Sequence, residues 1–351
     1  MRILAVTNML PIPQHPSSGR FVEQQIEGLK REGLDIDVLF VQRLEKGMTA
    51  YASLPAQLRS RIALSQPDLV HSMYGGVMAD LVTLFVNDRP TVVTFHGSDL
   101  LGQPFEGAVR KAVAKCGVFA SRRAARRCSS IILVAKSLCS ALPPDIDNSK
   151  VRVIPCGIDL DLFRPLNRET CCQRLGWQLD RFHVLFQNTG DPVKRPLLAR
   201  AAIDSVKRLG TRAELHELKG VPYAEVSTWL NASDALLVTS IHEGSPTIVK
   251  EALACDLPIV SVDVGDVGER IKGISGCYLA VPEPEDLGSK LHLIALHMKR
   301  IFGHSSVQDL SCEKIAVRLE HFYSETLKRH RGTTAHLLSR PPVRNKEGSP
   351  N

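Results

Sequence analysis

The stretch from Asp234 to Ile259 constrains the fold of this chain more than any other. Its first part, Asp234 to Ser240, is an apolar run with a β-branched residue between polar ends, which is typical of a buried strand. A Gly-Ser-Pro turn follows, and apolar residues then recur at helical spacing: Ile248, Val249, Ala252 and Leu253. Ser245 suits the N-cap and Pro246 the first helical position, so the pattern predicts a helix that begins there and ends before Pro258.

A strand, a glycine-containing turn and a helix N-terminus together direct unpaired backbone N–H groups at one point, which favours an anion. Glu243 lies in this turn, where its carboxylate can accept hydrogen bonds from ligand hydroxyls. Glu251 lies about a turn and a half into the helix, near enough to hold a second part of the same ligand, such as a ribose. The alternative is that Glu243 is only a surface residue of a loop and Glu251 a solvated helix residue.

The sequence E-G-S-P-x-x-x-x-E-A-L-A, followed by D-L-P-I-V, resembles the donor-site signature of the retaining GT-B glycosyltransferases, in particular glycosyltransferase family 4. In that family the first glutamate contacts the transferred sugar, the second binds the nucleotide ribose, and the intervening amides hold the sugar and diphosphate. The resemblance therefore implies a catalytic role for Glu243, ribose binding by Glu251, and donor contacts from four residues of the turn: Gly244, Ser245, Pro246 and Thr247.

The length of 351 residues predicts two domains, each with a sizeable core. No apolar run reaches the roughly 20 residues that cross a bilayer, and the N-terminus lacks a signal-peptide cleavage site. The nine cysteines show no C-x-x-C pair and no metal spacing, which indicates reduced thiols. We therefore expect a cytoplasmic protein. The net charge of +7 favours anionic partners, namely nucleotide or lipid headgroup; no nucleic-acid-binding module is recognisable, so we expect no nucleic-acid partner.

The first 41 residues read as a strand, a Pro- and Ser-rich loop, a helix and a second strand. This βαβ opening lacks G-x-G-x-x-G, which argues against a dinucleotide site. In the resembling family the loop lies at the interdomain cleft and helps to hold the donor diphosphate or the acceptor. Gly19 is the matching residue and Arg20 a weaker anion contact; alternatively, Gly19 only permits a turn.

Two further predicted strands, 67–71 and 90–96, end in polar residues. Ligands of open α/β sheets gather beyond the carboxyl ends of the strands, so we expect His71, His96 and Asp99 on one rim. The phrase H-G-S-D is similar to the family's acceptor-side loop, which implies that His96 lies near the reacting sugar and has a catalytic role. His71 and Asp99 are acceptor-side candidates, although a buried structural histidine is the usual explanation for a residue such as His71.

The segment from Val109 to Cys128 carries no acidic residue and seven basic ones: Arg110, Lys111, Lys115, Arg122, Arg123, Arg126 and Arg127. Interspersed apolar residues predict one or two amphipathic helices. Such a helix suits peripheral contact with an anionic membrane at the inner face, while a solvated helix face is the equal alternative.

The pattern P-x-G-I-D-x-x-x-F-x-P, from Pro155 to Pro165, resembles the family's interdomain connection. We therefore expect an N-terminal acceptor-side domain over residues 1–165 and a C-terminal nucleotide-sugar donor domain over 166–311. A terminal helix over 312–330 crosses back to the first domain in this fold. Residues 331–351, rich in Pro, Ser and Arg, read as a disordered basic tail.

In the donor domain the family grips the diphosphate with a Gly-Arg pair and a later lysine. Lys194 fits the lysine, but Asn188-Thr189 stands in place of the Gly-Arg pair. Arg195 is our substitute for the missing arginine, with Arg20 of the other domain as the alternative. The family packs its nucleobase near residues 219–221.

These features predict an α/β GT-B enzyme, with two Rossmann-like domains facing across a cleft. The implied reaction is retaining transfer of a hexose from a nucleoside-diphosphate sugar to a hydroxyl acceptor, which we expect to be lipid-linked or part of a cell-surface polysaccharide or glycolipid. Positive charge from the helix N-terminus and Lys194 replaces a metal, so we expect no metal ligand and no cofactor. Two alternatives stay open: a nucleotide-sugar epimerase and a catalytically silent nucleotide-binding scaffold.

Overall fold

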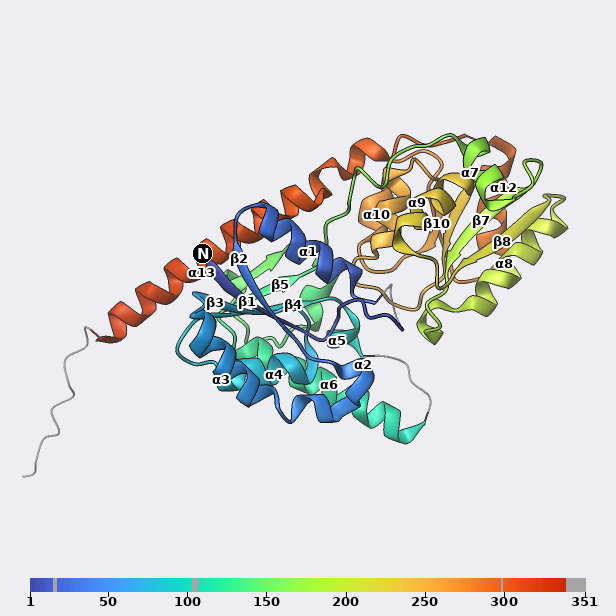
Figure 1. Ribbon diagram of the computed structural model, residues 1–351. Helices are drawn as coiled ribbons and strands as arrows, with labels where there is room; N and C mark the ends of the chain where they lie inside the picture. The colour runs from blue at the N-terminus through green and yellow to red at the C-terminus, as the bar shows by residue number, and fades with distance from the viewer. Residues whose placement is uncertain (15–17, 103–106, 298, 339–351) are drawn as a thin grey trace, which may run out of the picture.

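The computed structural model describes residues 1–14, 18–102, 107–297 and 299–338, and it contains two separate parallel sheets (Figure 1). The first sheet has the order β2-β1-β3-β4-β5-β6, with β1 (Arg2–Thr7), β2 (Asp35–Phe40), β3 (Leu69–Ser72), β4 (Thr91–Phe95), β5 (Ser130–Leu133) and β6 (Val151–Val153). The second has the order β11-β10-β9-β7-β8, with β7 (Phe182–Gln187), β8 (Ala213–Leu218), β9 (Ala235–Val238), β10 (Ile259–Val262) and β11 (Tyr278–Ala280).

The inner strands are short and buried on both faces, which explains their near-continuous apolar sequences. Helices connect successive strands, as parallel pairing requires. Those of the first domain are α1 (Arg20–Arg31), α2 (Arg43–Lys46), α3 (Leu54–Ser65), α4 (Gly76–Phe85), α5 (Ser98–Leu101) and α6 (Ala108–Arg127). Those of the second are α7 (Arg168–Leu175), α8 (Pro196–Arg208), α9 (Tyr223–Ala232), α10 (Thr247–Ala254), α11 (Val267–Ile271) and α12 (Pro284–His297). Short 3₁₀ turns complete the chain, at 47–51, 136–141, 148–150, 192–194 and 304–310.

Two segments cross between the domains, and they run beside each other. The connection after β6 bridges to the segment after 304–310 through Ile158 and Ser311, with the Ile158 amide donating to the Leu310 carbonyl at 2.9 Å. The backbone N–H of Cys312 then donates to the carbonyl of Ile158 at 3.0 Å. This pairing holds the two crossings together.

The last helix, α13 (Cys312–Leu338), runs from the second domain along the first and packs against α1 (Figure 1). Its Tyr323 is fully buried and lies 2.8 Å from His71, and its Thr326 lies 2.7 Å from Ser130. The prediction that a tail begins at residue 331 is wrong for residues 331–338, because the helix continues to Leu338 and the first helix-breaking residues are Pro341 and Pro342. The remainder of the predicted tail, 339–351, lies outside the described residues.

Candidate functional site

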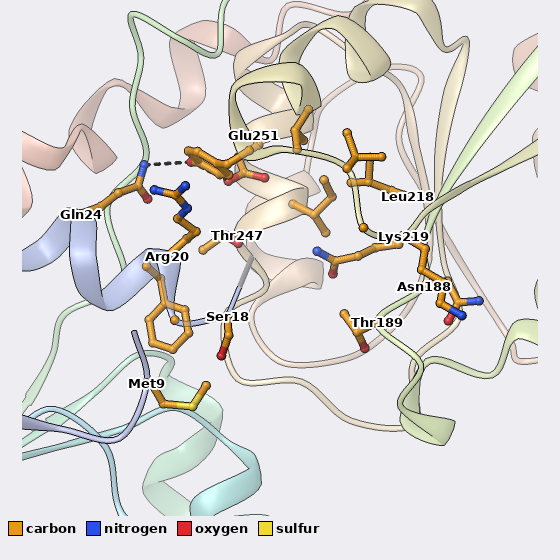
Figure 2. A pocket seen from close by; sticks show the side chains of 18 of the residues that line it. Met9, Ser18, Arg20, Gln24, Asn188, Thr189, Leu218, Lys219, Thr247 and Glu251 are labelled. Carbon is orange, nitrogen blue, oxygen red and sulfur yellow. Dashed lines mark hydrogen bonds between the residues drawn. The ribbon is translucent and has the colours of Figure 1, made fainter. Parts of the chain in front are cut away.

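A cleft of about 600 Å³ separates the two domains at the carboxyl ends of their central strands (Figure 2). The first domain contributes residues of the loop after β1 and of α1: Met9, Ser18, Gly19, Arg20, Phe21 and Gln24. The second contributes the ends of β7 and β8 and the starts of α9 and α10: Asn188, Thr189, Lys219, Gly220, Val221, Tyr223, Thr247 and Glu251. The cleft therefore contains the predicted Gly19, Arg20, Thr247 and Glu251, and the predicted nucleobase loop.

Lys194 and Glu243 form an ion pair at the carboxyl edge of the second sheet. The lysine ammonium lies 2.6 Å from Glu243 Oε1 and also donates to the Gln187 side chain at 3.2 Å. The Ser240 hydroxyl donates to the same oxygen of Glu243 at 2.7 Å. Both charged side chains are largely buried, so the loop after β7 and the turn after β9 present one fixed pair of opposite charges.

The helix after this turn begins later than its sequence predicts. α10 starts at Thr247, with Pro246 in extended geometry at the N-cap and no side-chain cap. The prediction of Ser245 as the N-cap is wrong, because its hydroxyl donates to Asp266 Oδ2 at 2.8 Å instead. The N–H group of Val249 donates to the Pro246 carbonyl at 3.2 Å, so those of Thr247 and Ile248 remain as donors at the mouth of the cleft.

Glu251 lies on the first turns of α10, buried in the wall of the cleft. The Tyr223 hydroxyl donates to its Oε1 at 3.1 Å and accepts a hydrogen bond from the Gln24 side chain of α1 at 2.9 Å (Figure 2). Burial raises the pKa of Glu251 to about 7, and the hydrogen bond from Tyr223 and the nearby Lys250 oppose that rise. Glu251, the residue predicted to bind the ribose, is thus connected to the first domain through the hydroxyl of Tyr223.

The loop after β4 touches the donor turn directly. A Cβ atom on Gly244 would lie 1.9 Å from the carbonyl oxygen of His96, and one on Gly97 would lie 2.9 Å from the amide of Gly244. Gly265 backs Gly244 from the other side, where a Cβ would come within 2.2 Å of its carbonyl. The structure therefore brings the two loops that carry His96 and Glu243 into backbone contact across the domain boundary.

The His96 ring is held by its own domain. Its Nε2 donates to the carbonyl of Met73 at 3.0 Å, its Nδ1 faces Cys156 Sγ at 3.7 Å, and the ring stacks on Tyr74. Burial lowers the pKa of His96 to about 4. The imidazole is therefore neutral at pH 7, with Nε2 as the protonated nitrogen.

The two acceptor-side candidates lie inside the first domain and not on the cleft surface. His71 is 1% exposed, with Nδ1 2.8 Å from the Tyr323 hydroxyl and Nε2 2.7 Å from Thr94 Oγ1. Burial lowers the pKa of His71 to about 3. Asp99 accepts backbone hydrogen bonds from Gly75, His96 and Gly97, and burial raises its pKa to about 6. The prediction that they face the acceptor is therefore wrong: His71 is a packed core residue, and Asp99 fixes the loop that carries His96.

Three other residues bear on the diphosphate contact. Gly19 has φ +67°, and a Cβ there would overlap the backbone of Met9 at 2.3 Å, so only glycine fits this turn. Arg20 lines the cleft, where it donates to Glu23 at 2.6 Å and lies over the Tyr223 ring. Arg195 points elsewhere: its guanidinium donates to the carbonyls of Thr239 and Ser240, which ties its loop to β9. The geometry does not favour the substitution of Arg195 for the missing arginine.

Three residues of this region are not evident in the sequence. Tyr223 and Gln24 have no motif, and only the fold brings them to Glu251. Lys250 is 0% exposed, and its ammonium donates to the carbonyl of Cys156 in the interdomain connection at 2.8 Å, while burial lowers its pKa. The sequence does contain a signal for Lys250, namely a lysine inside the apolar run of α10. A buried ammonium requires a hydrogen-bond partner, so this position predicts one.

The basic helix α6 divides into two parts. Arg123 and Arg127 pair with Asp80, and Arg126 pairs with Asp145 at 2.8 Å, so these charges are engaged by the domain itself. The first turns extend away from the sheet (Figure 1). They carry exposed basic side chains beside exposed apolar ones: Arg110, Lys111, Lys115, Val109 and Val113. Within residues 1–14, 18–102, 107–297 and 299–338, no helix has both the length and the apolarity needed to cross a membrane.

Two Rossmann-like domains that face a cleft, with a lysine–glutamate pair and a helix N-terminus on the donor side, define a GT-B glycosyltransferase. Residues 18–162 match the model of Glycosyltransferase Family 4, and residues 178–295 match that of Glycosyl transferases group 1. Together these models cover more than half of the chain. The chain belongs to this family and is an enzyme of the glycosyltransferase class.

Relatives and solved structures agree with this assignment. Bacillus subtilis (strain 168) TuaC, named as a teichuronic acid biosynthesis glycosyltransferase, is 26% identical over 76% of this chain and 82% of its own length. Sucrose-phosphate synthase from Thermosynechococcus elongatus superposes with a TM-score of 0.76, at 16% identity, over 94% of this chain and 100% of that one. Anabaena HepE in complex with UDP superposes with a TM-score of 0.68, at 16% identity, over 93% and 100%. The predicted GT-B fold is confirmed.

Proposed function

We propose that this glycosyltransferase transfers a hexose from a nucleoside-diphosphate sugar to a hydroxyl acceptor, with retention of the anomeric configuration. The observation that carries the proposal is the Lys194–Glu243 pair at one end of the donor wall, with buried Glu251 farther along α10. The Lys194–Glu243 pair suits contact with the sugar and the diphosphate, and Glu251 suits hydrogen bonding to the ribose. The crystal structures of HepE with UDP and with UDP-glucose support a ligand of this kind.

In this proposal the donor lies along the wall formed by the second domain. Lys219, Gly220 and Val221 take the base, and Glu251 accepts hydrogen bonds from the ribose hydroxyls. The free N–H groups at the start of α10 and the ammonium of Lys194 face the diphosphate, with Arg20 approaching from the other domain. The sugar then lies beside the Glu243 side chain, next to the place where its turn and the His96 loop are in backbone contact.

The proposed mechanism follows from where negative charge develops during the transfer. When the bond between the anomeric carbon and the diphosphate oxygen breaks, negative charge grows on the diphosphate, and fixed positive groups lower the barrier. Lys194 and the α10 N-terminus supply this charge from the protein, so we propose that transfer needs no metal and no cofactor. The acceptor oxygen attacks on the same face, and the leaving phosphate takes its proton, which retains the configuration.

Glu243 and His96 have different roles in this scheme. Glu243 is paired with Lys194 and suits an acceptor of sugar hydroxyl hydrogen bonds, because its Oε2 is not engaged by the pair. The neutral His96 lies behind the sugar position, where its backbone carbonyl and ring orient the loop. A nucleotide-sugar epimerase is the alternative that the sequence left open. An epimerase converts the donor by itself, whereas a glycosyltransferase also requires an acceptor.

We propose a cell-surface polysaccharide or glycolipid as the acceptor class, which is supported by the name of TuaC. The first turns of α6 suit peripheral contact with an anionic membrane, since they combine exposed Arg110, Lys111 and Lys115 with exposed Val109 and Val113. That placement suits a lipid-linked acceptor and a cytoplasmic enzyme at the inner face of the membrane.

The test is a thermal-shift panel of nucleoside diphosphates and their sugars on the wild type and Glu251→Ala. Stabilisation by one nucleotide class that is lost in the variant supports the donor site and identifies the base. Product analysis with that donor then distinguishes transfer from epimerisation, because only transfer requires an added acceptor. No stabilisation by any nucleotide at millimolar concentration would contradict the proposal.

A further inference from the structure

A cluster of three metal-binding side chains lies in the second domain, away from the cleft. His183 is on β7, and Glu214 and His216 are on the neighbouring strand β8. The strands pair in parallel with His183 opposite Glu214, and side chains two residues apart share a face, so all three project to the same side. His183 Nδ1 lies 2.9 Å from His216 Nε2, and Glu214 Oε2 lies 3.8 Å from the first nitrogen and 4.0 Å from the second.

The orientation of His183 is fixed by a second hydrogen bond. Its Nε2 is 2.8 Å from the carbonyl oxygen of Gln178, which can only accept, so Nε2 carries the proton. Nδ1 is therefore an unprotonated lone pair directed at His216 and Glu214. A histidine that donates one ring N–H to a carbonyl and presents the other nitrogen is the usual arrangement of a metal ligand. His183 is 0% exposed, so this orientation is held by packing.

The distances fit a metal ion without movement of the backbone. The circle through the three ligand atoms has a radius of about 2.1 Å, and zinc bonds to histidine nitrogen and carboxylate oxygen measure about 2.0–2.2 Å. We propose that His183 Nδ1, His216 Nε2 and Glu214 Oε2 bind Zn²⁺. The Glu214 side chain is half exposed, so the fourth position opens to solvent and takes a water molecule.

Two tryptophans and an arginine surround the three side chains. Trp177 stacks on His216 at 3.5 Å between ring centroids and lies 4.8 Å from His183, and Trp229 closes the apolar wall. Arg181 lies 3.6 Å from Oε1 of Glu214 and leaves Oε2 for the metal.

The position of the site indicates its role. His183 lies near the beginning of β7, whereas the cleft residues Gln187 and Asn188 lie at its end, so the metal is at the edge of the sheet opposite the donor. A bound ion connects β7 to β8 and holds the segment of Trp177 and Gln178 after α7. The site therefore lies apart from the cleft, and donor binding does not depend on it.

The experiment uses the full chain without an affinity tag, stripped with a chelator and titrated with Zn²⁺ alone. The chain has two tryptophans, Trp177 and Trp229, and their ring centroids are 5.4 Å apart beside this cluster, so intrinsic fluorescence reports on the site. Co²⁺, which quenches indole fluorescence and shows visible absorption bands when bound by nitrogen and oxygen, serves as the spectroscopic probe. Thermal unfolding with and without Zn²⁺ provides an independent measurement.

The variants are Glu214→Gln, on a half-exposed side chain, and His216→Gln. His292→Gln is the matched control, because His292 is a part-buried histidine of the same domain that bonds to Thr211. We expect one Zn²⁺ per chain, a rise of several degrees in the unfolding temperature, and binding at least about ten-fold weaker in both site variants and unchanged in the control. The proposal is overturned if the wild type binds no stoichiometric Zn²⁺, or if both site variants bind it as the control does; the two histidines are then only a hydrogen-bonded pair. The thermal shift by a nucleoside-diphosphate sugar, measured on His216→Gln, tests the donor site separately.

Discussion

The carbonyl oxygen of His96 lies so close to Gly244 that a Cβ atom at Gly244 would be 1.9 Å from it. The two residues belong to different domains and are far apart in the sequence, yet no side chain separates their backbones. The loop after β4 is therefore positioned against the turn before α10 by a glycine.

Gly244→Ala should separate these loops or destabilise the protein. The overlap is with the backbone carbonyl of His96, at 1.9 Å from its oxygen and 2.8 Å from its carbon, so it cannot be relieved by a side-chain rotation. We expect a loss of about 1–3 kcal/mol in the free energy of unfolding, measured with urea, and a marked loss of turnover. Gly117→Ala is the control, because Gly117 lies in α6 with open space around it and should gain up to about 1 kcal/mol. Equal stability and activity of the two variants would show that the contact is absent.

Glu243→Gln should lower kcat by about a hundred-fold or more while the KM for the donor changes little. The substitution removes the charge opposite Lys194 but keeps the shape, so it affects charge placement in the transition state more than binding. Steady-state kinetics measure both constants, with Glu285→Gln as control because its ion pair with Arg208 is exposed on the surface. Unchanged kinetics in Glu243→Gln would remove this residue from the active site.

Tyr223→Phe should raise the KM for the donor by about three- to ten-fold and leave kcat nearly unchanged. The lost hydroxyl donates to Glu251 and accepts from Gln24, so the buried carboxyl loses a donor and the two domains lose a connection. Tyr278→Phe, in the same domain on β11, is the control. A donor KM equal to that of wild type would indicate that Tyr223 does not orient Glu251.

Donor binding should weaken as the pH falls from 8 to 6, with a midpoint near 7, because burial raises the pKa of Glu251 to about 7 and the ribose hydroxyls require the carboxylate. The measurement is the dissociation constant of the nucleotide sugar, since the terminal phosphate of a free diphosphate itself titrates near pH 6. The pH dependence should disappear in Glu251→Gln. A pH-independent affinity in the wild type would contradict the assignment.

The same raised pKa has the opposite consequence for stability. The folded ligand-free protein binds the Glu251 proton more tightly than the unfolded chain, so this group's contribution to stability is lost as the pH rises from 4.5 through about 7. Glu251→Gln should therefore stabilise the ligand-free enzyme at pH 8, by up to roughly 3 kcal/mol, while weakening donor binding.

Replacement of Arg110, Lys111 and Lys115 by Glu should abolish binding to anionic phospholipid vesicles. These side chains are exposed on the first turns of α6 beside Val109, which is 78% exposed. Vesicle co-sedimentation at two salt concentrations measures the effect. The control variant reverses three exposed lysines elsewhere, Lys207, Lys272 and Lys314. If both variants and the wild type bind equally, α6 is a solvated surface helix.

The strands and the family could be predicted from the sequence because both depend on patterns among residues that are close together in the chain. The run from Asp234 to Ser240 contains β9, and the E-G-S-P motif identified the turn between β9 and α10, whose Glu243 pairs with Lys194. The geometry of Gly19 agrees with the alternative that it permits a turn, since that turn excludes a Cβ, while its contact with the donor stays a prediction. These features depend on neighbours in the chain, and one sequence contains them in full.

The incorrect and missing assignments involve contacts between distant residues. Ser245 has the right chemistry for an N-cap, but Asp266 of another loop takes its hydroxyl. His71 follows a strand, as site residues do, but Tyr323 of the last helix covers it. Tyr223 reaches Glu251 and Gln24, and His183 reaches His216, only after the sheets have formed. Such pairs follow no sequence spacing, so no reading of one chain alone predicts them.

The return of α13 to the first domain has a consequence for synthesis. Phe322, Tyr323 and Thr326 are buried against the first domain, so its core is incomplete until α13 has left the ribosome. Domains generally fold in the order in which they emerge. In this enzyme the domain that is translated first is finished last, and until then the exposed surface around His71 needs protection from aggregation.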